Sequence, residues 1–271
     1  MTTSSTPRAL IRSVWRHKNL IQAFAAREVS ARYRGSFLGL LWSFVTPFLM
    51  LAVYTFVFGF VYKARWGGLD DGNKFQFAMI LFAGLIVFNL FAECMNRAPS
   101  LILGHATYVK KVVFPLEVLP CAVLGAALFH ALVSFVVLLA ALAILQGVPV
   151  TTLWLPVVLA PFLLMILGFS WFLAALGVYV RDVGHIMGML VTVCLFLSPV
   201  FYPVSILPRP WQLVLMANPL TFIIEQTRAI LLDGHAPNLA GLGAYGLMAA
   251  VLAWAGFAWF QKTRTGFADV L

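Results

Sequence analysis

Long apolar runs without charged side chains restrict what this chain can fold into more than any other feature. Six runs are recognisable, and each is close to or above the ~20 residues that a helix needs to cross a bilayer. They cover approximately residues 37–62, 76–96, 116–146, 153–180, 186–204 and 239–261. Hydrophobic residues make up 62% of the chain and charged residues 10%, so a water-soluble fold would expose large apolar patches. The runs predict an all-α polytopic membrane protein with six transmembrane helices.

Lysine and arginine are unevenly divided between the two sides that six spans create. Of the 18 residues, 13 lie on the side of both termini and 5 on the other. Because cytoplasmic segments are enriched in these residues, both termini are predicted to be cytoplasmic. The same bias accounts for the net charge of +9 without a nucleic-acid partner, since no basic stripe lies on a soluble face.

The segment that precedes the first run, residues 8–34, has the spacing of an amphipathic helix. Leu10, Val14 and Phe24 share one broad face, while arginines cluster on the opposite face. We expect this helix to lie in the cytoplasmic interface near lipid phosphates; a basic tail that only sets orientation is the alternative. The expected organisation is a cytoplasmic amphipathic segment at 1–34, a transmembrane domain at 35–264 and a cytoplasmic tail at 265–271.

Residues 198–237, between the fifth and sixth runs, contain six prolines and yet remain apolar. Proline cannot continue a helix without losing a hydrogen bond and clashing with the preceding turn. The apolar stretches 211–216 and 220–232 are too short to span a bilayer. We predict a pair of short re-entrant helices on the periplasmic side, with broken backbone shielded by protein; a plain external loop is the alternative.

The sequence shows no chemistry of its own that would drive transport. A phosphate-binding loop needs the pattern GxxxxGK[ST], and the nearest approach, Gly67 to Gly72, is followed by Asn73. Ion-coupled carriers place ionisable residues within the membrane, but His130 is the one clear mid-span case, and we expect it to hydrogen-bond a neighbouring helix. Three scattered cysteines give no disulfide or metal spacing. We therefore expect no catalytic residue, metal or cofactor in this chain, and an energy source on another chain.

The segment 97–115 joins the second and third runs on the predicted cytoplasmic side. Pro99 with Ser100 suits a helix start, and Pro115 limits its end. A short helix here would transmit the movement of a partner; an ordinary connecting helix is the alternative.

Three motifs follow one another along the chain. They are REVSARYRGSFLGLLW at 27–42, RDVGH at 181–185 and SPVFYP at 198–203, the last followed by Leu207-Pro208, Trp211 and Asn218-Pro219-Leu220. This ordered set resembles the ABC-2 type permeases that export polysaccharides, and it covers nearly the whole chain. Within that family the chain is most similar to O-antigen exporter permeases, with teichoic-acid and capsule permeases as relatives.

The resemblance implies the assembly, the partners and the location. The chain is expected to form a homodimer that binds two copies of a separate ABC ATPase, which binds ATP and Mg²⁺, and that contacts membrane lipids. The expected cargo is a lipid-linked polysaccharide, O-antigen in the first place, exported across the bacterial inner membrane. The resemblance also implies that segment 97–115 holds the gate and the ATPase-coupling region, and that 198–237 forms the periplasmic re-entrant helices. The expected coupling residues are Ser100, His105, Tyr108, Lys110 and Lys111.

Aromatic side chains suit the path of a sugar polymer, which has apolar ring faces as well as hydroxyls. The expected path residues are Tyr54, Phe58, Tyr62, Phe196, Phe201 and Tyr202. Lipid-facing packing or an interfacial belt is the alternative for each, since the chain has 24 Phe.

Two small-xxx-small patterns, 35–39 and 184–188, permit close approach of helices within or between subunits. Four other functions remain open from the sequence: an ABC-2 permease for teichoic acid or capsule, an ABC-2 permease for a small molecule, an ATP-independent channel or carrier, and a membrane-embedded glycan-modifying enzyme.

Overall fold

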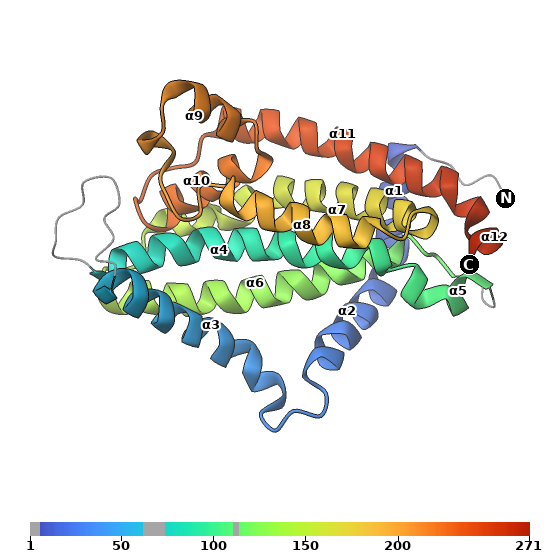
Figure 1. Cartoon of the computed structure of the whole chain (residues 1–271), viewed down its shortest axis with the longest axis horizontal. Coiled ribbons are helices and arrows are strands. Elements are labelled where there is room, and N and C mark those ends of the chain that lie inside the picture. Colours follow the sequence, from blue (N-terminus) through green and yellow to red (C-terminus); the bar gives the residue numbers. More distant parts are fainter. Residues whose placement is uncertain (1–5, 62–73, 111–113) are drawn as a thin grey trace.

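Residues 6–61, 74–110 and 114–271 are described by the structure, a computed structural model (Figure 1). Within these ranges the chain is helical and contains no strand. The long helices run side by side along the longest axis of the molecule, and both termini lie at the same end of the bundle (Figure 1). We call this end the terminal end.

Among the residues that the structure describes, five helical stretches are long and apolar enough to cross a membrane: Gly39–Phe58, Phe75–Ser100, Val118–Leu145, Val150–Tyr179 and Leu239–Val270. Their main helices are α3 (Trp42–Tyr54), α4 (Lys74–Arg97), α6 (Val118–Leu145), α7 (Leu155–Tyr179) and α11 (Leu239–Thr263). The short helices η1 (Gly39–Leu41), η2 (Thr55–Val61) and η5 (Val150–Trp154) extend α3 and α7. Five of the six predicted runs therefore form helices of the expected kind.

The fifth predicted run, 186–204, forms the shorter helix α8 (Val183–Phe196). Its 14 residues rise about 21 Å, less than the ~30 Å of a hydrocarbon core. The helix ends because Pro199 and Pro203 follow within a few residues, and proline removes a donor and restricts the residue before it.

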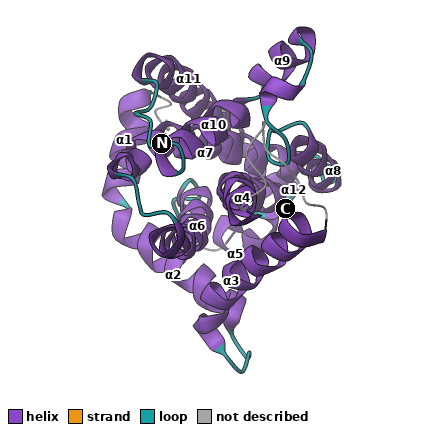
Figure 2. Ribbon diagram, turned by 90° about the vertical axis from the view of Figure 1, so that its left-hand side faces the viewer, coloured by secondary structure: helices purple, strands orange, loops and turns teal. Residues whose placement is uncertain are grey.

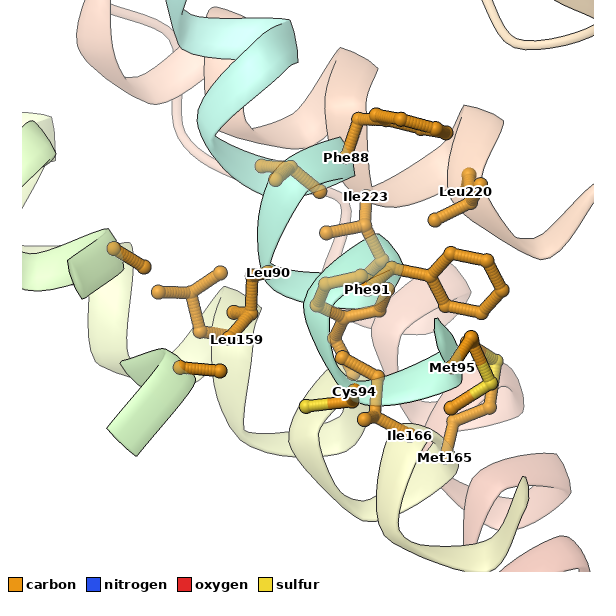
Figure 3. Close-up of a cluster of buried hydrophobic side chains, with 14 of the residues drawn as sticks. Phe88, Leu90, Phe91, Cys94, Met95, Leu159, Met165, Ile166, Leu220 and Ile223 are labelled. Carbon is orange, nitrogen blue, oxygen red and sulfur yellow. The ribbon is translucent and has the colours of Figure 1, made fainter. Parts of the chain in front are cut away.

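The centre of the bundle is α4, with α3, α6, α7, α8 and α10 (Pro219–Leu231) arranged around it (Figure 2). Figure 3 shows how the core is built: Phe88, Leu90, Phe91 and Met95 of α4 meet side chains of α7 and α10. The labelled partners are Leu159, Met165 and Ile166 of α7 and Leu220 and Ile223 of α10. A helix that is apolar on nearly all sides is thus covered by protein rather than by lipid.

Glycine allows α7 and α11 to touch along their backbones. A Cβ on Gly168 would lie 2.7 Å from the backbone of Leu252, and Gly256 faces the carbonyl of Gly168. Such contact is the usual role of small residues between membrane helices.

The two patterns expected to play that role do not play it within this chain. Gly35 and Gly39 have φ of +82° and +51°; Gly35 lies in the turn that follows α2, and Gly39 is the first residue of η1. Gly184 and Gly188 are helical, and none of the four glycines has an atom of a neighbouring segment within 4 Å of an added Cβ. Packing through either pattern between two subunits stays a prediction.

The amphipathic N-terminal segment forms two helices, α1 (Pro7–Arg16) and α2 (Lys18–Tyr33), where one was expected. The break is at His17, whose backbone N–H and ring Nδ1 both lie within hydrogen-bonding distance of the Ser13 carbonyl. Helix α2 packs against α6, and it joins α3 at the apex of a V that projects from the bundle (Figure 1).

The proline-rich segment forms the two predicted short helices, α9 (Arg209–Met216) and α10, after the single turn η6 (Val204–Ile206). Asn218 caps α10 by accepting a hydrogen bond from the Leu220 N–H at 3.0 Å. Arg228 of α10 is 5% exposed and donates to the carbonyls of Ile80 (3.0 Å), Pro199 (2.5 Å) and Val200 (2.9 Å). One buried guanidinium thus ties α10 to α4 and to the turn after α8.

Candidate functional site

The predicted coupling segment folds into three short helices at the terminal end: η3 (Ala98–Ser100), η4 (Leu103–His105) and α5 (Ala106–Lys110). The single helix expected from Pro99 onward is therefore interrupted. Ser100 and Lys110 are exposed, as a docking surface requires. Lys111, also expected to take part, lies outside the described residues.

Aromatic rings connect α5 to α2. Tyr108 stacks on Phe114 with ring centroids 4.8 Å apart, and Phe24 of α2 lies 6.0 Å from Tyr108 and 5.3 Å from Phe114. His105 also stacks on Tyr108 at 5.7 Å. We call Phe24, His105, Tyr108 and Phe114 the aromatic cluster. Tyr108, one of the predicted coupling residues, is thus in contact with α2, and His105, another of them, packs against Tyr108.

Arg27 strengthens this connection from the α2 side. Its guanidinium lies 4.3 Å from the centre of the Phe24 ring and donates to the Tyr108 hydroxyl at 3.4 Å. A cation over an aromatic face adds to the packing energy of the rings.

Glu117, a residue next to the aromatic cluster, connects the start of α6 to α1, to α7 and to the turn after α11. Glu117, directly before α6, is 8% exposed and accepts hydrogen bonds from Ser13 of α1 and Arg264, both at 2.9 Å. Arg264 opens η7 (Arg264–Gly266), the turn between α11 and α12 (Phe267–Val270), and also donates to the Phe114 carbonyl at 2.9 Å. The Glu117 carbonyl accepts from Trp171 Nε1 of α7 at 3.0 Å. We call Ser13, Glu117 and Arg264 the Glu117 network.

Sequence reasoning missed this network. Glu117 and Arg264 lie 147 positions apart in the sequence, so no local pattern pairs them. The one sequence signal that could have paired them is that both residues fall on the predicted cytoplasmic side.

The predicted path residues of the first run lie on both sides of a change in helix type. Tyr54 ends α3, and Phe58 lies in η2, a π-helical stretch; their ring centroids are 6.4 Å apart. Phe58 also packs 5.5 Å from Phe77 of α4. A π-helix has more residues per turn than an α-helix, and across this change a spacing of four still leaves the Tyr54 and Phe58 rings in contact. Tyr62 lies outside the described residues.

The path residues of the fifth run gather at the end of α8. Phe196 is 62% exposed, its ring lies 6.1 Å from Phe201, and its carbonyl accepts from the Tyr202 hydroxyl at 2.7 Å. The structure brings these three together; their contact with a polymer stays a prediction.

A polar cavity opens between α2, α3, α4 and α6. Two adjoining hollows of about 420 and 510 Å³ share Arg32, Glu93, Asn96 and His130 in their walls. Arg32 pairs with Glu93 at 2.7 Å, and His130 Nδ1 lies 3.1 Å from the same carboxylate. The prediction that His130 hydrogen-bonds a neighbouring helix is confirmed. A second ion pair, Glu28 with Arg97, also joins α2 to α4.

The arrangement offers a polar cavity that could bind a ligand. In the described ranges no three His, Cys, Asp or Glu side chains are grouped to hold a metal ion. The cysteines are free, and the buried thiols line no cavity described above.

Comparison with known proteins identifies relatives along most of the chain. The family described as ABC-2 type transporter matches residues 19–232. The chain is 31% identical over 263 residues to the O-antigen export system permease protein RfbA of Myxococcus xanthus, covering 96% of this chain and 98% of the relative. It is 23% identical to the protein of the same description from Klebsiella pneumoniae, over 93% of this chain and 95% of the relative. It is 22% identical to the polysialic acid transport protein KpsM of Escherichia coli, over 90% and 93%.

Proposed function

This chain belongs to the ABC-2 type transporter family, and from that premise we propose that it is the permease subunit of an exporter of lipid-linked polysaccharide. The observation that carries the proposal is the similarity to an O-antigen export permease over 96% of the chain at 31% identity. The five long apolar helices make it a multi-pass membrane protein. O-antigen is the proposed cargo.

The proposed setting is the bacterial inner membrane, with the terminal end in the cytoplasm. The charge bias supports this orientation, since 13 of the 18 Lys and Arg fall on that side. In this arrangement α8 with the turn after it forms the sixth crossing, α1 lies in the interface, and α9 and α10 enter the membrane from the periplasmic side.

Two copies of the chain, each bound to a separate ATPase subunit, form the proposed transporter. The chain shows no phosphate-binding loop in its sequence, so ATP hydrolysis falls to the partner. A single bundle whose centre is filled by α4 leaves little room for a polymer (Figure 2), whereas two copies can line a path between them.

The proposed coupling starts at α5, where Ser100 and Lys110 are exposed. When the ATPase subunits close on ATP, they displace α5. The aromatic cluster passes the displacement to α2, and the Glu117 network passes it to α1, α6 and the end of α11. The helices that carry the path then move together, because interfaces of packed side chains shift as units.

A second candidate cargo is a capsular polysaccharide such as polysialic acid. The similarity to the polysialic acid transport protein favours it, at 22% identity over 90% of the chain. Capsular polysaccharide is the second candidate because the chain has higher identity to the O-antigen permease.

Deletion of the gene in the source bacterium tests the proposal. The expected result is loss of surface polysaccharide with accumulation of undelivered glycolipid inside the cell, both reversed by the intact chain. Typing the missing polymer as O-antigen or capsule separates the two cargoes. An unchanged surface polysaccharide, with altered tolerance to a small molecule instead, would refute both.

A further inference from the structure

The polar cavity between α2, α3, α4 and α6 has features that the coupling role does not use. Its hollow of about 420 Å³ is lined by side chains of α2 and α3, the two arms of the V in Figure 1, and of α4 and α6. This volume falls within the ~300–1,000 Å³ typical of small-ligand sites. Residues on all four helices line it.

Two amides and a carboxylate form a polar stripe on the α4 wall. Asn89, Glu93 and Asn96 are spaced by four and three residues, so they share one face of the helix. Asn89 is exposed although its neighbours on both sides are buried, and it lies eight residues, about 12 Å, before the end of α4 at Arg97. Neither asparagine makes a hydrogen bond to any other group that the structure describes, which leaves both amides open to a ligand.

Hydroxyl groups face these amides from the other walls. Thr46 and Tyr54 of α3 line the same cavity, and among the described residues their hydroxyls have no hydrogen-bond partner. Ser134 of α6 lines it as well, but donates to the His130 carbonyl at 2.9 Å. Polar groups at this depth are costly in lipid unless something satisfies them.

The charges at the mouth of the cavity cancel. Arg32 pairs with Glu93 and Arg97 with Glu28, so two cations meet two anions. A phosphate site would need surplus positive charge, as phosphate-binding sites use unpaired Arg or Lys. The balance favours an uncharged ligand.

Apolar surfaces complete the wall. Phe82 of α4 and the Tyr54 ring lie among the lining residues, together with Met50. Ring faces beside amides and hydroxyls match a ligand that has hydroxyls at its edge and C–H groups on its face. A glycosyl unit is such a ligand.

We propose that this cavity is a glycosyl-binding site in each subunit, in which Asn89 and Asn96 hydrogen-bond sugar hydroxyls while Tyr54 and Phe82 pack against the ring. The proposal rests on the proposed function, because it takes the exported polymer as the ligand. The lining residues all belong to one subunit, Tyr54 is shared with the predicted path, and the site holds a sugar beside the helices that move on coupling.

Photocrosslinking in cells that export the polysaccharide tests the proposal. The photoreactive residue p-benzoylphenylalanine replaces Asn89 in the full-length chain, and in a second strain it replaces Asn96, which is exposed at the mouth. Leu49 is the matched control, since it is 50% exposed on α3 but lines neither hollow. After irradiation, the purified chain is probed for attached glycan, attached lipid and crosslinked dimer.

We expect glycan adducts at 89 and 96 to exceed those at 49 by about tenfold, and Asn89→Leu to lower export per assembled transporter by up to about tenfold, the effect of one lost hydrogen bond. If both positions form adducts only with lipid or with a second copy of the chain, the glycosyl site is overturned. The proposed function still stands in that case, provided that the unsubstituted chain exports the polysaccharide. Normal surface polysaccharide in cells that lack the chain would overturn the proposed function and the site together.

Discussion

Replacement of Arg228 by Met should unfold the region where α10 meets α4. Met keeps most of the aliphatic length of the side chain but none of the donors. Arg228 is 5% exposed, and its guanidinium donates to three carbonyls.

The cost can be worked from those three acceptors. The Ile80 carbonyl lies in the first half of α4 and keeps its helical partner, so its loss is the smallest. The carbonyls of Pro199 and Val200 lie in the turn after α8 and accept no backbone hydrogen bond in the described ranges. Leaving a buried acceptor unsatisfied costs about 1–3 kcal/mol, so two of them predict a loss of about 2–6 kcal/mol in the free energy of unfolding.

Titration of the purified chain with SDS in mixed micelles, followed by far-UV circular dichroism and tryptophan fluorescence, measures this loss. Arg209→Met is the matched control: the residue opens α9 and is exposed, and exposed substitutions usually change stability by within about 0.5 kcal/mol.

A double substitution sharpens the test. A Cβ on Gly84 would lie 2.7 Å from Arg228 Nη2, so Gly84→Ala should destabilise the natural chain and cost clearly less when residue 228 is Met. Additive effects of the two changes, or an Arg228→Met loss below about 1 kcal/mol, would refute the account of Arg228 as the tie between α10 and α4.

Three further changes follow from the packing and the coupling. Gly168→Leu should prevent α7 and α11 from approaching and so reduce the amount of folded protein in the membrane. Gly188→Leu is the control, since Gly188 has open space around it. Equal yields of the two variants in a fluorescence-detected size-exclusion assay would contradict this. Tyr108→Ala should remove the ring that joins α5 to α2 and lower transport per ATP hydrolysed, with ATPase binding kept, as measured in proteoliposomes; unchanged coupling would count against the aromatic cluster. Phe58→Ala should leave assembly and basal ATP hydrolysis intact while surface polysaccharide falls, and unchanged export per assembled transporter would place the path elsewhere.

Local patterns predicted the helices well where hydrophobic runs ended at charged residues or turns. The run 76–96 corresponds to α4 (Lys74–Arg97), and the run 239–261 corresponds to α11 (Leu239–Thr263). The length of an apolar run depends on the bilayer and the helix rise alone, so sequence suffices. The predicted run 186–204 extends beyond the end of α8, because the apolar composition of the sequence continues past Pro199, where the helix has ended.

Contacts between distant segments were not accessible to such reasoning. The pairing of Glu117 with Arg264 and the approach of Gly168 to Gly256 depend on which helices become neighbours. When a helix is apolar on every face, its sequence does not show which face packs against which other helix. Ring chemistry and spacing predicted that Tyr54 and Phe58 are neighbours, but no sequence pattern indicated the π-helical stretch that contains Phe58.

Purification of the chain together with the ATPase encoded beside its gene tests the central claim most directly. The account predicts a stable complex whose ATP hydrolysis rises when the lipid-linked polysaccharide of the source bacterium is added, while the chain alone hydrolyses no ATP. A complex whose hydrolysis ignores the glycolipid, or a chain that exports the polysaccharide in proteoliposomes without any ATPase, would contradict it.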